Sequence, residues 1–167
     1  MSAEFQPLTL LRILREHGVD FVVVGGFAGN ILGSPLITTD LDVCYARDSA
    51  NLERIAAALR EVHANLRGAP SGLPFRLDVK TLANQINFTF ETDAGPLDLI
   101  GEPAGVSGYK ALAVNAEVVD LDGVEVLICA IEDLIRMKRA AGRMKDIGAL
   151  PTLEALREEI ETRRKRG

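Results

Sequence analysis

The stretch Phe21–Tyr45, FVVVGGFAGNILGSPLITTDLDVCY, decides the fold of this chain. Its apolar start, Phe21–Val24, predicts a buried strand, and the glycine pair that follows predicts a tight turn at the end of that strand. The next segment, Phe27–Gly33, consists mostly of small and apolar residues and predicts a short helix, which a Ser-Pro pair ends. A second strand, Asp40–Tyr45, comes after it. The stretch therefore predicts a strand, a turn, a helix, a turn and a second strand.

Two aspartates at the start of the second predicted strand are candidate metal ligands. Side chains two residues apart in a strand point to the same face, so Asp40 and Asp42 lie together while Leu41 and Val43 enter the core. Neighbouring carboxylates repel each other, and a cation between them relieves the repulsion. Because aspartate is depleted in strands, the pair predicts a metal site better than it predicts two solvated side chains.

The pair Gly25-Gly26 is a candidate phosphate site. Glycine has no Cβ, so the backbone N–H groups at the start of the following helix can approach an anion closely. A glycine pair alone is equally typical of an ordinary strand-to-helix turn. Beside two carboxylates, however, it predicts a site for a metal-bound nucleoside triphosphate.

These residues resemble a known signature. The arrangement Gly25-Gly26, thirteen residues, then Asp40-Leu41-Asp42-Val43 resembles that of the polymerase-beta-type nucleotidyltransferase superfamily. More narrowly, the chain resembles small bacterial nucleotidyltransferase-like proteins related to toxin–antitoxin and abortive-infection nucleotidyltransferases. Residues 132–146, EDLIRMKRAAGRMKD, are similar to the C-terminal helical pattern of that group. The similar blocks cover most of residues 21–150.

The resemblance implies a third carboxylate on a later strand. Asp98 is the candidate, because a Gly-Pro turn leads into the short apolar strand that contains it. A hairpin at Thr92–Gly95 precedes this strand, and the fold of the resembled superfamily implies that antiparallel pairing brings Asp98 beside the other two aspartates. Asp78 and Asp93 are weaker rivals, since Asp93 lies in a predicted turn, where aspartate is ordinary.

The resemblance also implies a fold and an activity. The fold is α/β (or α+β), a nucleotidyltransferase-type mixed sheet flanked by helices and followed by a helical C-terminal part. The activity is transfer of a nucleoside monophosphate from an NTP to a small-molecule, RNA or protein acceptor, with release of pyrophosphate and with Mg²⁺ or Mn²⁺ as cofactor. The implied catalytic and metal-binding residues are Asp40, Asp42 and Asp98, with Asp98 as a candidate general base. The implied nucleotide-binding residues are Gly25, Gly26, Thr39, Lys138 and Lys145.

Two other interpretations remain open. The chain is a tRNA-modifying toxin with an antitoxin partner, or it is a non-catalytic nucleotide-binding or interaction module. Leu36 stands where the resembled group often carries arginine, which favours the module, whereas three carboxylates favour the enzyme. Thr39 is also an ordinary strand former, and the lysines at 138 and 145 also fit a solvated helix face.

Composition limits the class of protein. The chain has 167 residues, of which 47% are hydrophobic, and this suits one domain or one domain with a small appendage. We expect a nucleotidyltransferase-like core over residues 1–105 and a hairpin with C-terminal helices over residues 106–167, or a single domain. No apolar run approaches the ~20 residues of a membrane span and no signal peptide is evident, which predicts a cytoplasmic location without membrane partners. The net charge of −5 argues against broad nucleic-acid affinity, although basic residues gather at 136–145 and 163–166.

Periodicity predicts the remaining elements. Cys44 and Cys129 lie in apolar segments and are expected to be buried free thiols, while His17 and His63 lack metal-ligand spacing. A Gly-, Pro- and Ser-containing loop is expected at 67–74, and Thr152 is expected to cap the last helix. The expected helices are 7–17, 52–62, 131–141, 145–150 and 152–164, and the expected strands are 20–24, 40–45, 75–80, 85–91, 96–100, 116–121 and 124–128.

Overall fold

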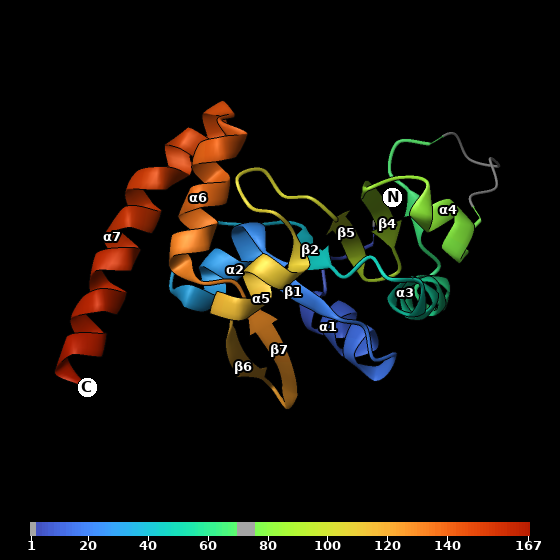
Figure 1. Cartoon of the computed structure of the whole chain (residues 1–167), viewed down its shortest axis with the longest axis horizontal. Coiled ribbons are helices and arrows are strands. Elements are labelled where there is room, and N and C mark those ends of the chain that lie inside the picture. Colours follow the sequence, from blue (N-terminus) through green and yellow to red (C-terminus); the bar gives the residue numbers. More distant parts are fainter. Residues whose placement is uncertain (1–2, 70–75) are drawn as a thin grey trace.

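The segment that decides the fold adopts the predicted order of elements. In the computed structural model, which describes residues 3–69 and 76–167, β1 (Phe21–Val24) is buried along its whole length. Helix α2 (Gly25–Leu32) begins at the first glycine, and β2 (Leu41–Tyr45) returns antiparallel to β1. These three elements form the centre of the fold (Figure 1).

The described strands form one mixed sheet of seven strands in the order β3-β4-β5-β2-β1-β7-β6. The pairs β1–β7 and β2–β5 are parallel, and the other neighbouring pairs are antiparallel. The predicted mixed sheet of an α/β fold is therefore confirmed. The remaining strands are β3 (Asn65–Leu66), β4 (Asn87–Thr92), β5 (Gly95–Ile100), β6 (Glu117–Leu121) and β7 (Val124–Ile128).

Helices lie around this sheet. Helix α1 contacts β7 and α3, whereas α2 contacts β1, β2 and α6. Helices α6 and α7 lie side by side at one end of the molecule, and α3 and α4 lie at the other (Figure 1). The buried side chains form one core cluster that runs from α1 to α7, and its members are almost all aliphatic or aromatic. The remaining helices are α1 (Pro7–Glu16), α3 (Ser49–Glu61), α4 (Val79–Ala83), α5 (Tyr109–Asn115), α6 (Ile131–Ala141) and α7 (Met144–Arg166).

Local signals explain several element ends. The side chain of Asp48 accepts a hydrogen bond from the backbone N–H of Asn51 and so caps α3. Asp122 and Gly123 both have positive φ, the geometry of the two-residue hairpin turn that joins β6 and β7. Gly142 ends α6 in the left-handed conformation.

The strand expected at 75–80 is a wrong prediction. Phe75 lies outside the described residues, and the part from 76 onward leads into helix α4. Asp78 begins this helix, because its carboxylate accepts a hydrogen bond of 2.8 Å from the backbone N–H of Thr81. The loop expected at 67–74 starts with two turn residues after β3, a short strand that the sequence analysis did not predict; residues 70–74 lie outside the described part.

The two helices expected after Gly142 are one helix, which is a second correction. Helix α7 continues from Met144 to Arg166 with Pro151 inside it, so Thr152 is not an N-cap. Pro151 is exposed, whereas Leu153 and Leu156 on the following turns are buried. Burial of these two leucines offsets the hydrogen bond that proline removes from the helix. Helix α5 was also not predicted.

Two further expectations concern the whole chain. Cys44 and Cys129 are buried free thiols, as expected, and burial raises the pKa of both to about 12. Among the described helices none is both long and apolar enough to cross a membrane. The hairpin β6–β7 joins the central sheet beside β1, so one sheet contains strands from residues 1–105 and from residues 106–167.

Candidate active site

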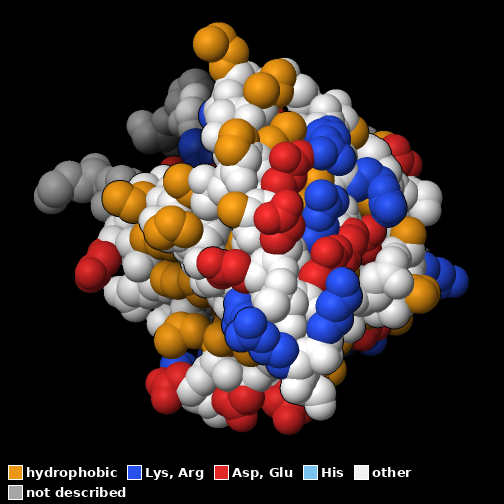
Figure 2. All heavy atoms as spheres, turned by 90° about the vertical axis from the view of Figure 1, so that its left-hand side faces the viewer, with side chains coloured by type: hydrophobic (Ala, Val, Ile, Leu, Met, Phe, Trp, Pro, Cys, Tyr) orange, Lys and Arg blue, Asp and Glu red, His pale blue; other side chains and the backbone are white. Residues whose placement is uncertain are grey.

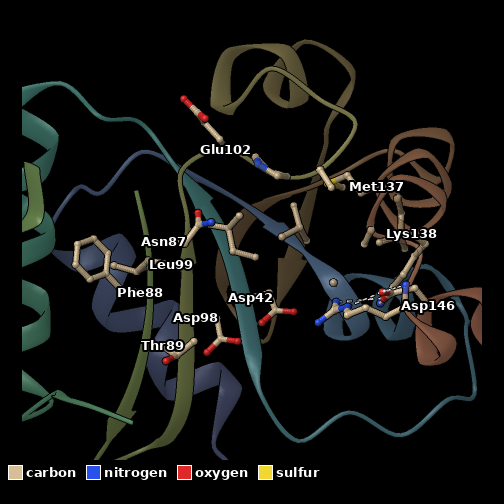
Figure 3. A pocket seen from close by; sticks show the side chains of 18 residues that line it. Asp42, Asn87, Phe88, Thr89, Asp98, Leu99, Glu102, Met137, Lys138 and Asp146 are labelled. Atoms are coloured by element: carbon tan, nitrogen blue, oxygen red, sulfur yellow. Dashed lines mark hydrogen bonds and ion pairs between the residues drawn. The ribbon is translucent and has the colours of Figure 1, made fainter. Parts of the chain in front are cut away.

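Three carboxylates meet at the edge of α2. The parallel register of β2 and β5 places Asp42 directly opposite Asp98, and Asp40 immediately precedes β2. One carboxylate oxygen from each of these residues lies within 4.8 Å of the others, and the close view shows the side chains of Asp42 and Asp98 side by side (Figure 3). The expected neighbourhood of Asp98 is thus present. The pairing that creates it is parallel, however, because the hairpin β4–β5 inserts β5 beside β2 in the direction of β2.

The two rival aspartates lie elsewhere. Asp78 caps α4, and Asp93 contacts His63 in an exposed ion pair of 2.5 Å. In the part of the chain that the structure describes, the only group of three or more candidate metal-ligating side chains is Asp40, Asp42 and Asp98.

Position 25 requires glycine because its backbone lies against the side chain of Asp42. Its φ of +70° lies in the left-handed region, and a Cβ at this position would lie 2.1 Å from Oδ2 of Asp42. A Cβ on Gly26 would lie 2.9 Å from the hydroxyl oxygen of Thr38. Because Gly25 has no side chain, the N-terminus of α2 lies directly against the carboxylate of Asp42. No described side chain caps this N-terminus, so its N–H groups are available to a ligand.

The surroundings of Asp42 are those of a metal ligand. Burial is the main reason that its pKa rises to about 7, and the negative charges of Asp40 and Asp98 raise it further, while Lys138 lowers it in part. Its Oδ1 atom is buried and has no hydrogen-bond partner among the described residues. Three clustered carboxylates with an unpartnered buried oxygen fit a divalent cation that prefers oxygen ligands, such as Mg²⁺.

Asp98 forms an ion pair that no sequence pattern predicts. Arg67 donates from Nη2 to Oδ1 of Asp98 over 2.8 Å and from Nε to Oε1 of Glu91 over 3.1 Å. Burial raises the pKa of Asp98, and the charge of Arg67 opposes this rise. No local motif marks Arg67. It reaches Asp98 because its backbone N–H bonds to the carbonyl of Thr89 beyond the end of β3.

A second missed group lies on the helices. Asp146 is 1% exposed and accepts hydrogen bonds from Nε of Arg143 (2.6 Å) and Nζ of Lys138 (3.2 Å). Burial alone would raise the pKa of Asp146, but these hydrogen bonds and charges lower it below its ordinary value. The signal in the sequence was the position of Asp146 directly after the basic residues at 136–145, which is typical of an ion-pair centre.

A cavity of about 400 Å³ connects these groups, and we refer to it as the polar cavity. The start of α2 and the carboxylates form one wall, and side chains of α6 and α7 form another. All eight residues that the sequence predicted for the site line this cavity: Gly25, Gly26, Thr39, Asp40, Asp42, Asp98, Lys138 and Lys145. Arg143 also lines it, as does Leu36.

Comparison with solved structures shows that the fold is similar to that of nucleotidyltransferases. No protein-family model and no curated protein sequence matches the chain. The lincosamide antibiotic adenylyltransferase LnuA, solved with lincomycin bound, is 9% identical with a TM-score of 0.59, over 92% of this chain and 99% of that chain. The antibiotic-resistance factor ANT(2'')-Ia is 14% identical with a TM-score of 0.56, over 95% of this chain and 90% of that chain. An antigenic nucleotidyltransferase-like protein from Paracoccidioides brasiliensis is 17% identical with a TM-score of 0.51, over 89% of this chain and 73% of that chain.

Proposed function

We propose that this protein is a metal-dependent nucleotidyltransferase that moves a nucleoside monophosphate from an NTP to an acceptor and releases pyrophosphate. One observation carries the proposal: three clustered carboxylates and the uncapped N-terminus of α2 line the same cavity. The similarity of the fold to the lincosamide antibiotic adenylyltransferase LnuA and to the antibiotic-resistance factor ANT(2'')-Ia supports this class of reaction.

The carboxylates and the helix have separate roles in the proposal. Asp40, Asp42 and Asp98 would hold Mg²⁺ or Mn²⁺, which supplies charge stabilisation at the triphosphate and at the attacking oxygen. The backbone N–H groups that begin α2 bind phosphate oxygens, and Gly25 allows their close approach. Asp98 accepts the proton of the acceptor hydroxyl, while Arg67 holds its other oxygen in place.

Basic side chains face the helix start across the polar cavity. Lys138 and Arg143 are fixed by Asp146, and Lys145 has no hydrogen bond or ion pair with another described residue. We assign these side chains to the β- and γ-phosphates, since cations stabilise the negative charge that develops there. These three side chains give the polar cavity positive charge. Leu36, which also lines the cavity, gives none, although the resembled group often has arginine at that position.

A non-catalytic nucleotide-binding module is the second candidate. Leu36 favours it, because that side chain adds no charge to the polar cavity. The unpartnered oxygen of Asp42 fits a metal ligand in either candidate, and transfer of a labelled nucleotide separates the enzyme from the module.

The experiment is transfer of label from each α-³²P NTP, with Mg²⁺, to a mixture of candidate acceptors that includes hydroxyl compounds, tRNA and the protein itself. Asp42→Asn should reduce transfer by roughly 100-fold or more, since loss of a metal ligand removes several kcal/mol of transition-state stabilisation. Asp122→Asn is the matched control, because it makes the same change in the exposed β6–β7 turn. Unchanged transfer in Asp42→Asn contradicts the assignment.

A further inference from the structure

A second cavity adjoins Asp42 and Asp98 on the side of β4 and of the loop after β5. It has a volume of about 310 Å³ (Figure 3). It shares with the polar cavity the residues Gly25, Asp42, Asp98, Ile100, Leu134, Lys138 and Arg143. We refer to it as the apolar cavity, because apolar side chains from β1, β5, the loop after β5 and helix α6 form most of its wall. They include Val24, Ile100, Pro103, Leu134, Met137 and Ala141. Polar and charged residues also line the cavity: Asn87, Thr89, Glu102, Lys138, Arg143 and Asp146.

The size and lining of the apolar cavity suit a small molecule. Ligand pockets in proteins have volumes of roughly 300–1,000 Å³, so this one is at the lower end of that range. Burial of apolar ligand surface against such a wall supplies the affinity, while a few polar groups fix the orientation. The polar groups closest to the reaction are the carboxylates of Asp42 and Asp98, which lie at the boundary with the polar cavity.

The surroundings of the cavity do not suit RNA. Binding of a phosphodiester backbone depends on lysine and arginine side chains that are free to neutralise phosphates. In the cluster at 136–145, Lys138, Arg143 and Lys145 line the polar cavity and are assigned to the NTP, and the other two cations are paired, Arg136 with Asp133 and Arg139 with Glu154. On the face that α7 presents, blue and red side chains alternate and form no continuous basic surface (Figure 2).

We propose that the apolar cavity binds the acceptor, and that the acceptor is a small, uncharged compound with an apolar body and a hydroxyl group. This inference rests on the proposed nucleotidyl transfer. The apolar body lies between the sheet and Met137 of α6, and the hydroxyl points to Asp98.

The reaction then balances as follows. The hydroxyl proton passes to the carboxylate of Asp98, and the acceptor oxygen forms a bond to the α-phosphorus of the NTP. The bond between that phosphorus and the oxygen that bridges to the β-phosphate breaks, and pyrophosphate leaves with the bonding electron pair. The product is a phosphodiester in which the α-phosphate joins the acceptor to the nucleoside.

The test fills the apolar cavity without touching the carboxylates. Ala141 is exposed at the C-terminal end of α6 and lines only the apolar cavity, so Ala141→Phe occupies space there without overpacking the core. Ala111→Phe is the matched control, because Ala111 is an exposed helical alanine that lines neither cavity. The probes are 2-phenylethanol and 4-phenylbutanol, with tobramycin and total tRNA for comparison.

Two quantities are measured with Mg²⁺ present: binding of each phenylalkanol and each NTP by calorimetry, and transfer of label from α-³²P NTP. We expect the wild type and Ala111→Phe to bind and modify a phenylalkanol and not tobramycin or tRNA. We expect Ala141→Phe to weaken phenylalkanol binding at least tenfold with unchanged NTP affinity.

Other results overturn the inference in distinguishable ways. Weaker NTP binding in Ala141→Phe would mean that the nucleobase occupies the apolar cavity. Transfer to tRNA or tobramycin alone would mean that the acceptor is polar and charged. If the wild type binds NTP but no phenylalkanol, the acceptor class is wrong and the proposed function stands. If the wild type binds no NTP, the proposed function fails, and the acceptor role of the cavity fails with it. Phenylalkanol binding would then show only that the cavity accepts an apolar ligand.

Discussion

Arg67 holds Asp98 by a hydrogen-bonded ion pair of 2.8 Å between Nη2 and Oδ1. The same guanidinium group bonds to the carboxylate of Glu91 and to the backbone carbonyl of Phe90, so three acceptors fix its position. Asp98 is thereby oriented through a residue that lies 31 positions earlier in the chain. One oxygen of Asp98 is committed to Arg67, which leaves the other for a metal ion or an acceptor proton.

The first prediction concerns this pair. Arg67→Ala should lower the rate of nucleotidyl transfer by about 10- to 100-fold, the usual effect of removing a group that orients a metal ligand. Arg67→Lys should restore part of the rate, because lysine keeps the charge but not the forked geometry. The measurement is the pH profile of kcat with each variant. A purely structural role for Arg67 would instead lower the amount of folded protein and leave the profile of kcat unchanged.

The second prediction concerns Gly25. Gly25→Ala should abolish Mg²⁺-dependent NTP binding, because its Cβ would overlap Oδ2 of Asp42 and its φ is positive. Gly148→Ala is the control: it lies within α7 with nothing inside 4 Å of its Cβ, and it should raise the free energy of unfolding by about 0.5–1 kcal/mol. Calorimetry and urea denaturation give the two quantities. Normal NTP affinity in Gly25→Ala would show that the close approach at this glycine is unimportant.

The third prediction is a pH dependence of the metal-free protein. The pKa of Asp42 is about 7 in the folded state against 3.8 ordinarily, so the folded protein binds more protons than the unfolded chain between these values. Its free energy of unfolding should therefore fall as the pH rises from 4 to 7, by a few kcal/mol in total. Burial raises the pKa of Asp98 too and acts in the same direction.

Urea denaturation with EDTA at several pH values checks this dependence. Asp42→Asn should remove most of it, since asparagine does not titrate. Added Mg²⁺ should stabilise the protein more at pH 8 than at pH 5, because the ion competes with the proton for the same carboxylate. A metal-free protein whose stability increases from pH 5 to pH 7.5 is inconsistent with the buried carboxylate cluster.

The fourth prediction concerns Asp146. Asp146→Asn should lower the free energy of unfolding by about 1–3 kcal/mol, since a buried charged acceptor of several hydrogen bonds is lost. It should also weaken NTP binding, because Lys138 and Arg143 lose the group that positions them. Glu158→Gln on the exposed side of α7 is the control and should change stability by less than about 0.5 kcal/mol. Equal NTP affinity in both variants argues against a phosphate-binding role for this helix pair.

The central part of the fold was predictable from local sequence. Apolar runs, the glycine pair and the Asp122-Gly123 turn each specify their own geometry, so β1, α2, β2 and the hairpin β6–β7 lie close to where the pattern places them. The aspartate of β5 was expected beside Asp40 and Asp42, and the structure shows this proximity. Its direction of pairing was not predictable from the hairpin alone, since a hairpin fixes only its own two strands.

The rest depends on contacts between distant segments. Arg67 lies in a turn, and only the approach of its backbone to β4 brings it to Asp98. Pro151 normally ends a helix, and α7 continues through it because Leu153 and Leu156 are buried beyond it. Asp146 was visible in the segment 132–146, but its burial depends on how α7 packs on α6.

The most direct test of the central claim is calorimetric titration of each NTP, with and without Mg²⁺, into the wild type and into Asp40→Asn/Asp42→Asn. The account predicts that the wild type and the control Asp122→Asn bind at least one NTP only when Mg²⁺ is present, and that the double variant loses this binding. Equal NTP binding by the wild type and the double variant, or no NTP binding by the wild type, would contradict it.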